Sequence, residues 1–147
     1  MRPPGKNLDK IQVEGIASSK VVELWPSIIS RVERALVNGN SLASSASIQN
    51  YILKNEMQLW FVRQAEKLLA VVITQIENFD TAHVLHIVAL EGTDMEKWLF
   101  ELERVLRVFG AAHGCRYLSM QGRRGWVKTL KNLNWYESSV IMHKELL

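Results

Sequence analysis

Apolar residues recur at helical spacing in two long stretches of the chain. One stripe runs through residues 28–36, and a clearer one runs from Trp98 to Phe109. Apolar positions three, four and seven residues apart share one face of an α-helix. The first helix is expected to begin at Ser18 or Ser19, and Asp94 is expected to cap the second.

Strand patterns occupy the middle of the chain. Three apolar runs, Gln58–Gln64, Leu68–Ile76 and Val84–Leu90, are separated by short turns, which predicts an antiparallel meander. The central run is almost continuously apolar, so this strand is expected to be buried on both faces. A fourth run, Tyr117–Met120, follows the long helix, so it can lie parallel to the third in a right-handed crossover.

Shorter elements complete the predicted order. Ser47 is predicted to cap a short helix, Gly125–Leu133 to form another, and Trp135–Glu145 to form a final strand. Residues 1–17 show no sustained period and are predicted to be a flexible tail before a single domain at 18–147. The order α-α-β-β-β-α-β-α-β predicts an α+β (α/β) fold. Its central sheet is expected to be mixed and mostly antiparallel, with helices on both faces.

Composition adds a few limits to this picture. The 147 residues are 48% hydrophobic and 22% charged, which is typical of a soluble domain with a real core. No apolar run approaches the ~18 residues of a membrane span, and the basic start MRPPGKN does not resemble a secretory signal. One cysteine, Cys115, excludes an internal disulfide and fits a reducing compartment. No histidine, cysteine or carboxylate spacing predicts a metal site.

Charge is distributed unevenly along the second half of the chain. Residues 77–103 hold seven acids and one base, whereas residues 104–136 hold seven bases and no acid. Two interpretations are open. The blocks are two solvated faces that attract each other, or the basic block binds an anion such as a nucleotide cofactor or a nucleic acid.

Several short motifs, taken with the predicted order, resemble one family. They are QLW at Gln58–Trp60, AVVIT at Ala70–Thr74, Glu91-Gly92, Gly114-Cys115 and GRRGW at Gly122–Trp126. Together they resemble the GCN5-related N-acetyltransferase (GNAT) fold, and most closely the small GNAT-like proteins of tailed bacteriophages. The resemblance covers roughly residues 20–146.

The resemblance implies a site for acetyl-CoA between the third and fourth of the predicted strands. The family holds the pyrophosphate on a glycine-rich loop at a helix start, where this sequence offers Ala89, Gly92 and Asp94, and only Gly92 matches. The family's general-acid tyrosine corresponds here to Leu130. These two departures leave acetyl transfer and a non-catalytic scaffold both open.

Site residues follow from the same resemblance. His86, expected to share a strand face with Val88 and Leu90, is the candidate general base, and the alternative is a hydrogen-bonded sheet histidine. The implied cofactor-binding set comprises Val88, Leu90, Gly92, Thr93, Arg123, Arg124 and Lys128.

Three functions therefore compete. The first is an N-acetyltransferase that acts on a small-molecule or protein amine. The second is a phage scaffold in the host cytoplasm or the virion, which self-assembles or binds a protein through exposed Trp60, Trp126 or Trp135. The third and weakest is nucleic-acid binding through the basic block at 104–131.

Overall fold

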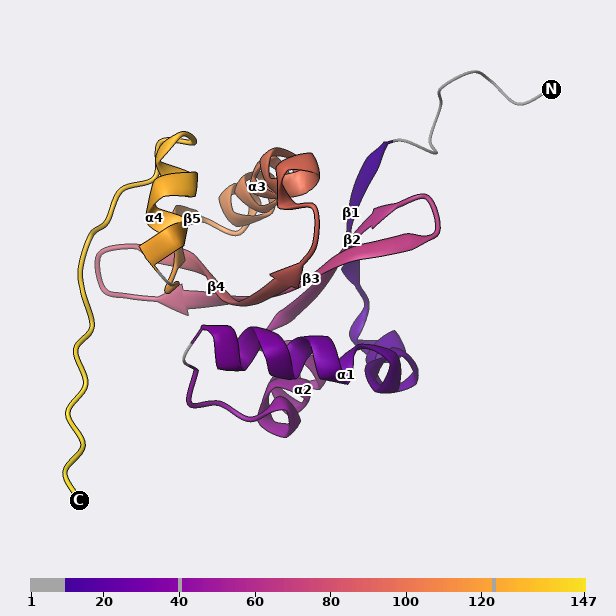
Figure 1. Ribbon diagram of the computed structural model, residues 1–147, viewed down its shortest axis with the longest axis horizontal. Coiled ribbons are helices and arrows are strands. Elements are labelled where there is room, and N and C mark those ends of the chain that lie inside the picture. Colours follow the sequence, from indigo (N-terminus) through magenta and orange to yellow (C-terminus); the bar gives the residue numbers. More distant parts are fainter. Residues whose placement is uncertain (1–9, 40, 123) are drawn as a thin grey trace.

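The computed structural model describes residues 10–39, 41–122 and 124–147, which form one sheet flanked by helices (Figure 1). The elements in chain order are β1 (Ile11–Ile16), the 3-10 turn η1 (Ser18–Lys20), α1 (Val21–Asn38), α2 (Ser45–Leu53), β2 (Gln58–Gln64), β3 (Lys67–Asn78), β4 (His83–Gly92), α3 (Met95–Ala112), β5 (Cys115–Met120) and α4 (Arg124–Lys131).

The sheet has five strands in the order β1-β2-β3-β4-β5. The first three pairings are antiparallel, and β4 pairs with β5 in parallel across the α3 crossover. This arrangement confirms the predicted meander, the parallel crossover and the mixed, mostly antiparallel sheet. Residues 69–74 of β3 are all buried, as the continuous apolar run predicts.

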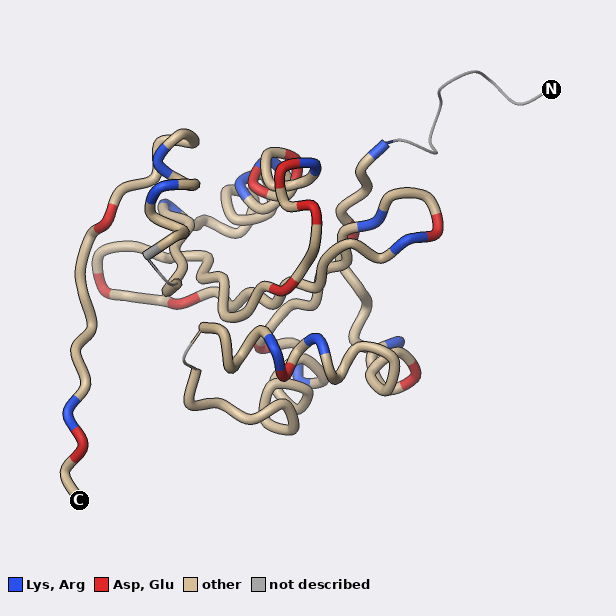
Figure 2. Tube along the Cα trace, viewed as in Figure 1, with Lys and Arg blue, Asp and Glu red and all other residues tan. Residues whose placement is uncertain are grey.

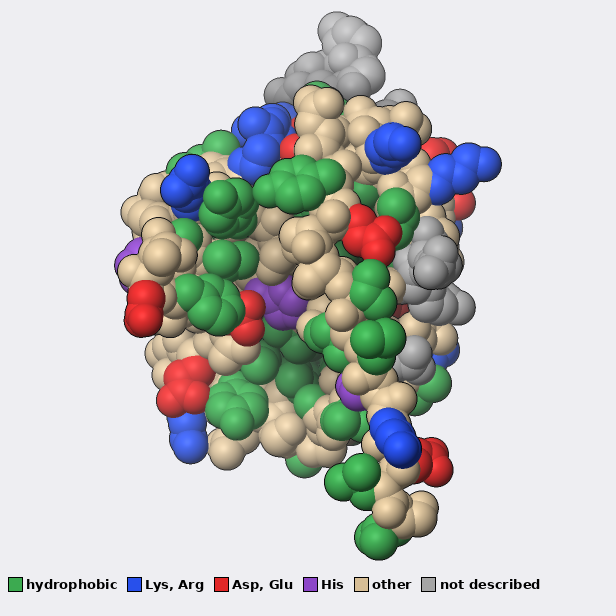
Figure 3. Space-filling model, turned by 90° about the vertical axis from the view of Figure 1, so that its left-hand side faces the viewer, with side chains coloured by type: hydrophobic (Ala, Val, Ile, Leu, Met, Phe, Trp, Pro, Cys, Tyr) green, Lys and Arg blue, Asp and Glu red, His purple; other side chains and the backbone are tan. Residues whose placement is uncertain are grey.

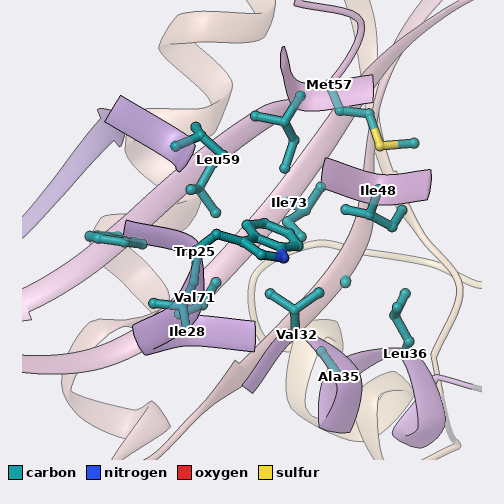
Figure 4. Packing of buried hydrophobic residues seen from close by; sticks show 14 residues of the cluster. Trp25, Ile28, Val32, Ala35, Leu36, Ile48, Met57, Leu59, Val71 and Ile73 are labelled. Carbon is teal, nitrogen blue, oxygen red and sulfur yellow. The ribbon is translucent and has the colours of Figure 1, made fainter. Parts of the chain in front are cut away.

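Two apolar layers cover the two faces of the sheet. The first packs α1 and α2 against β2 and β3, and Figure 4 shows Trp25 and Ile28 of α1 in the same layer as Val71 and Ile73 of β3. The second packs α3 against the opposite face, where Trp98, Leu102 and Leu106 are 0–1% exposed. Each such side chain contributes about 1.5–3 kcal/mol of transfer free energy. Helices therefore lie on both faces, as predicted.

The cap of α2 differs from the prediction by three residues. Ser44, not Ser47, is the N-cap, and its Oγ accepts a hydrogen bond from the Ser47 backbone N–H at 3.2 Å. The serine-rich loop offers several hydroxyls, so sequence alone does not select which one satisfies the free N–H groups.

A strand lies inside the stretch predicted to be a flexible tail. β1 pairs antiparallel with β2 along its whole length, from Ile11 opposite Gln64 to Ile16 opposite Leu59. Gly15 lies against the ring of Trp60, and a Cβ there would be 3.5 Å from the ring, which is ordinary van der Waals contact. The strand was missed because its six residues carry only a short alternation, and β2 supplies its stability. Residues 1–9 lie outside the described part of the chain.

The predicted final strand, Trp135–Glu145, does not form. Residues 135–147 have no regular secondary structure, and all of them after Trp135 are exposed. Val140, Ile141 and Met142 are consecutive, so an extended strand would place apolar side chains on both faces. This weak alternation specifies no buried face and therefore no register.

Candidate cofactor cleft

The last part of β4 has only one neighbouring strand. β4 and β5 are paired from His83 to Ile87, where Ile87 lies opposite Met120. Beyond that point β4 continues to Gly92, whereas β5 ends at Met120. The backbone of Ala89–Gly92 is paired with β3 on one side, and no described strand pairs with it on the other. Backbone donors and acceptors on such an edge are available to a ligand.

This splayed end opens into a cleft of about 590 Å³. The end of β4, the end of α1, the start of α3 and the first turns of α4 surround it. Figure 3 shows the hollowed side of the molecule, where apolar side chains and a histidine lie in the hollow. The residues that line the cleft include Arg34, Asn38, Val88, Leu90, Glu91, Gly92, Asp94, Met95, Gln121, Gly122, Gly125, Trp126 and Thr129.

A β-bulge changes which face each residue of β4 presents. Ile73 of β3 lies opposite Ala89, but Thr74 lies opposite Ile87, so Val88 is the extra residue. Val88 packs with the α1-side core, whereas Leu90 packs with the α3-side core. The prediction that His86, Val88 and Leu90 share one face is therefore wrong for Leu90. An extra residue reverses the alternation and is invisible to a strict period-two pattern.

His86 lies in the paired half of β4, next to the cleft rather than in its lining. Its Nδ1 lies 2.8 Å from Ser119 Oγ on β5. Burial lowers the pKa of His86 below its ordinary value of 6.5, and the Glu77 carboxylate opposes part of that shift. A lowered pKa keeps the imidazole neutral near pH 7, so it can accept a proton. The contact with Ser119 fits the sheet-histidine interpretation as well.

Gly92 is required by packing. A Cβ there would lie 2.6 Å from Ala70 Cβ, 2.8 Å from the Leu69 carbonyl oxygen and 2.9 Å from the Trp98 ring. Its neighbour Thr93 donates its backbone N–H to the same Leu69 oxygen at 3.0 Å. Trp98 Nε1 in turn donates to the Thr93 carbonyl at 2.6 Å. The amide of Thr93 is thus already paired within the protein, so it is not a free phosphate ligand.

Asp94 is the N-cap residue of α3, as predicted, but its side chain accepts no hydrogen bond from the helix. Its backbone is left-handed, with φ 54° and ψ 44°. The Asp94 carboxylate lies 4.0 Å from Lys97 Nζ. Figure 2 shows acidic positions at both ends of the loop between β4 and α3. Asp94 tolerates this conformation, but its charge is unfavourable to an anion.

Glu91 and two arginines of α1 form a charge cluster at the cleft. Arg34 Nη2 lies 3.4 Å from Glu91 Oε1, and Arg31 Nε lies 3.8 Å from Glu91 Oε2. Glu91 is 14% exposed and Arg34 59% exposed, so the carboxylate is covered while the guanidinium reaches solvent. Sequence reasoning did not assign these residues to the site, because 57 positions separate Arg34 from Glu91 and no local spacing connects them.

Of the three basic residues predicted to meet phosphates, only Lys128 has a described side chain, and it does not line the cleft. Lys128 is exposed on α4. Arg123 lies outside the described residues, and so does the side chain of Arg124, whose backbone begins α4. Among the described residues, Arg34 is the one basic side chain that lines the cleft. Leu130, at the position of the family's tyrosine, is buried.

The acidic and basic blocks meet locally within α3. Arg104 pairs with Glu101, and Arg107 Nε lies 3.0 Å from Glu103 Oε1. These pairs support the interpretation of mutually attracting surface charges, and exposed pairs of this kind contribute about 0–1 kcal/mol each.

The other features considered from the sequence are a metal site, a membrane span, the single cysteine and the tryptophans. In the described part of the chain no cluster of three or more His, Cys, Asp or Glu could hold a metal ion, and no helix there is long and apolar enough to cross a membrane. Burial raises the pKa of the free Cys115 thiol, so it is not an activated nucleophile. Trp60 is only 6% exposed, so it cannot contribute to the predicted tryptophan interaction surface as the structure stands. Trp126 and Trp135 are half-buried.

Comparison with known proteins shows the fold. No family model matches the sequence, and no curated protein matches it. A predicted acetyltransferase from Clostridium acetobutylicum, solved with acetyl-CoA, gives a TM-score of 0.69 at 9% identity, covering 93% of this chain and 97% of that one. An aminoglycoside acetyltransferase from an uncultured soil metagenomic sample, solved with sisomicin, gives 0.67 at 14% identity over 93% and 97%. Glucosamine-6-phosphate N-acetyltransferase from Arabidopsis thaliana gives 0.63 at 10% identity over 94% and 99%.

These structures share the five-stranded, mostly antiparallel sheet and its helical layers over nearly the whole chain. The protein therefore has the GNAT acetyltransferase fold. At these identities the likeness establishes the fold alone, so activity has to be argued from the cleft.

Proposed function

We propose that the protein is an acetyl-CoA-dependent N-acetyltransferase whose cofactor lies along the unpaired half of β4. The observation that carries this proposal is the splay: β5 ends opposite Ile87, and the backbone of Val88–Gly92 borders a cleft of about 590 Å³. An extended arm with amide groups can pair with this free edge, as a further strand would. Acetyl-CoA supplies, when bound, an activated thioester carbonyl that an amine can attack.

Different residues of the cleft would hold the pantetheine arm and the phosphates of acetyl-CoA. Val88, Leu90 and the backbone between them would hold the pantetheine arm, and the apolar lining would exclude water. At the phosphate end Gly92 and Thr93 are used by packing, so Arg34 and the positive end of the α3 dipole would supply the positive potential. Arg124 and Lys128 remain proposed phosphate contacts from α4.

His86 is the proposed general base. It is neutral near pH 7 because burial lowers its pKa. Its neighbours Leu85 and Ile87 pack with the α3-side core, so His86 faces the α1 side of β4, and the acceptor amine is proposed to approach from that side. Leu130 cannot protonate the departing thiolate, so the α4 position used in the family contributes no proton here. The acceptor class we propose is a small-molecule amine, by analogy with the aminoglycoside and glucosamine-6-phosphate acetyltransferases that share the fold.

The test is isothermal titration of the protein with acetyl-CoA and with free CoA, followed by an acetylation assay on a panel of amines. Thr129→Trp fills the cleft from α4, so we expect it to abolish binding, because Thr129 lines the cleft. Val127→Trp is the matched control, since Val127 lies two positions away on the same helix, is 44% exposed and does not line the cleft. One-to-one micromolar binding lost only in Thr129→Trp supports the proposal, and no binding at millimolar cofactor refutes it.

A non-catalytic scaffold is the second candidate. The pairing of the Thr93 N–H within the protein, the charge of Asp94 and the leucine at position 130 all favour it, because each leaves the cleft without a group that the resemblance implies for binding or catalysis. In this proposal the protein is a phage component that binds a protein partner in the host cytoplasm or the virion. The same titration decides between the two, since the scaffold requires no affinity for acetyl-CoA.

A further inference from the structure

A polar pair lies at the inner end of the cleft. Ser119 on β5 lies opposite His86 on β4, and the next pair, Ile87 and Met120, is the last one before the two strands separate. Ile87 and Met120 both line the cleft. His86 and Ser119 are therefore one residue away from the point at which a ligand can enter between the strands.

The pair faces the α1 side of the sheet. The residues that flank it along the two strands pack with the α3-side core: Leu85, Ile87, Leu118 and Met120. Successive side chains of a strand alternate between its faces, so His86 and Ser119 point the other way. Gln75 of β3 lies opposite His86 on its other side, so three neighbouring strands carry a row of half-buried polar side chains. Polar groups in such positions are normally hydrogen-bonded, and the pair supplies one of these bonds.

The contact within the pair constrains the proton on the imidazole ring. Ser119 Oγ lies 2.8 Å from His86 Nδ1. A neutral imidazole carries one proton, and the hydrogen bond made by one nitrogen sets which nitrogen keeps a lone pair. A hydroxyl can accept from Nδ1–H, which leaves the lone pair on Nε2, or donate to a bare Nδ1, which leaves Nε2 protonated. The first arrangement is the one in which Nε2 can take a proton from an amine.

We propose that Ser119 is a positioning residue, which accepts the Nδ1–H of His86 and so keeps the lone pair on Nε2 for the acceptor amine. The inference rests on the proposed function, in which His86 is the general base. The proton that leaves the attacking amine moves to Nε2, while Nδ1 keeps its own proton on Ser119 Oγ. One contact thus satisfies the histidine within the sheet and prepares it as a base.

Charged and titratable groups around the ring come from three elements. Burial lowers the pKa of His86, and the Glu77 carboxylate of β3 opposes part of that shift. Tyr117 of β5, two positions before Ser119, is 44% exposed on the same face. The arginines of α1 that contact β4, Arg31 and Arg34, pair with Glu91 beyond the point of separation. Replacement of Ser119 therefore changes the hydrogen bond at Nδ1 and leaves these charges in place.

Ring ¹⁵N NMR of the full chain tests the proposal without any substrate. The His86 signals are those that disappear in His86→Gln. At a pH well above the ordinary value of 6.5, we expect the proton on Nδ1 and a bare Nε2. Ser119→Ala should move the proton toward Nε2, and Ser119→Thr, which keeps a hydroxyl, should retain the parent tautomer. A parent protein with the proton on Nε2 overturns the proposal.

The pKa of His86 in the same spectra gives a second criterion. An acceptor at Nδ1 stabilises the charged ring, so Ser119→Ala should lower the pKa of His86 further. If Ser119 instead donates to Nδ1, it stabilises the neutral ring, and its loss raises the pKa. A raised pKa in Ser119→Ala therefore overturns the proposal. Glu77→Gln is the control, because it should lower the pKa of His86 and leave the tautomer unchanged.

Kinetics connect the tautomer to turnover. Ser119→Ala should lower kcat by about 10-fold to about 100-fold, a part of the contribution of a general base. The dissociation constant of acetyl-CoA should not change, and Ser119→Thr should restore most of the rate. Full activity in Ser119→Ala overturns the positioning role alone. A parent protein that does not bind acetyl-CoA refutes the proposed function instead, whichever tautomer the spectra show.

Discussion

In its first half, His83–Ile87, β4 lies between β3 and β5, whereas in its second half, Val88–Gly92, it pairs with β3 alone. Both halves are largely apolar, so their composition does not separate them. The difference arises from the neighbour, because β5 has six residues and β4 has ten. The first half contributes to stability through pairing on both sides, and the second half leaves backbone groups for a ligand.

The largest effect is expected at the end of the unpaired half. Gly92→Val should lower the free energy of unfolding by about 3 kcal/mol, because the added side chain meets Ala70, Trp98 and the Leu69 backbone, which cannot all move aside. Gly125→Ala is the control: nothing lies within 4 Å of its Cβ position, so no loss is expected. Urea unfolding measures both. A Gly92 variant as stable as its parent would show that this glycine is free for a ligand.

The second-largest effect is expected at Thr74 of β3, which lies opposite Ile87 in the paired half of β4. Thr74 is fully buried; its Oγ1 accepts a hydrogen bond from Trp60 Nε1 at 2.9 Å and donates one to Gln58 Oε1 at 2.8 Å. Thr74→Val should cost about 1–3 kcal/mol, because it leaves a buried indole N–H unpaired. Thr74→Ser should cost less. Acetyl-CoA affinity should stay unchanged in both variants. A loss of affinity would show that the paired half of β4 also contributes to cofactor binding.

A smaller effect should appear in cofactor affinity alone. Asp94→Asn removes the carboxylate at the start of α3 and keeps a side chain that tolerates the left-handed backbone. Relief of one close like-charge contact is worth about 1 kcal/mol even in bulk-water dielectric. We expect acetyl-CoA to bind several-fold more tightly, as measured by titration. Unchanged binding would place the phosphates away from α3.

The smallest effect is the pH dependence of stability from His86. Its pKa is lowered in the folded protein, so the unfolded chain binds more protons between the two pKa values. Stability is therefore fully present above the unfolded value of about 6.5 and declines as pH falls through the folded value. His86→Gln should flatten the decline in Tm between about pH 7.5 and about pH 5. An unchanged slope would assign the decline to other groups.

The elements that sequence predicted well are those with long periodic patterns. The apolar stripe of α3 and the apolar run of β3 each bury a continuous surface. Such long patterns predict the type of element without knowledge of its neighbours. The sequence does not predict β1, because the stability of this strand depends on its pairing with β2. The predicted final strand does not form, because residues 140–142 do not alternate between apolar and polar side chains. The bulge at Val88 and the Arg34–Glu91 contact depend on neighbours far away in sequence, so only the structure reveals them.

The most direct test of the cofactor assignment is amide hydrogen exchange with and without acetyl-CoA. If the cofactor lies along the unpaired half of β4, peptides that contain Val88–Leu90 should become protected at saturating acetyl-CoA. Peptides from β2 and from the β2–β3 turn should not change. Binding without new protection at Val88–Leu90, or no binding at all, would contradict the assignment.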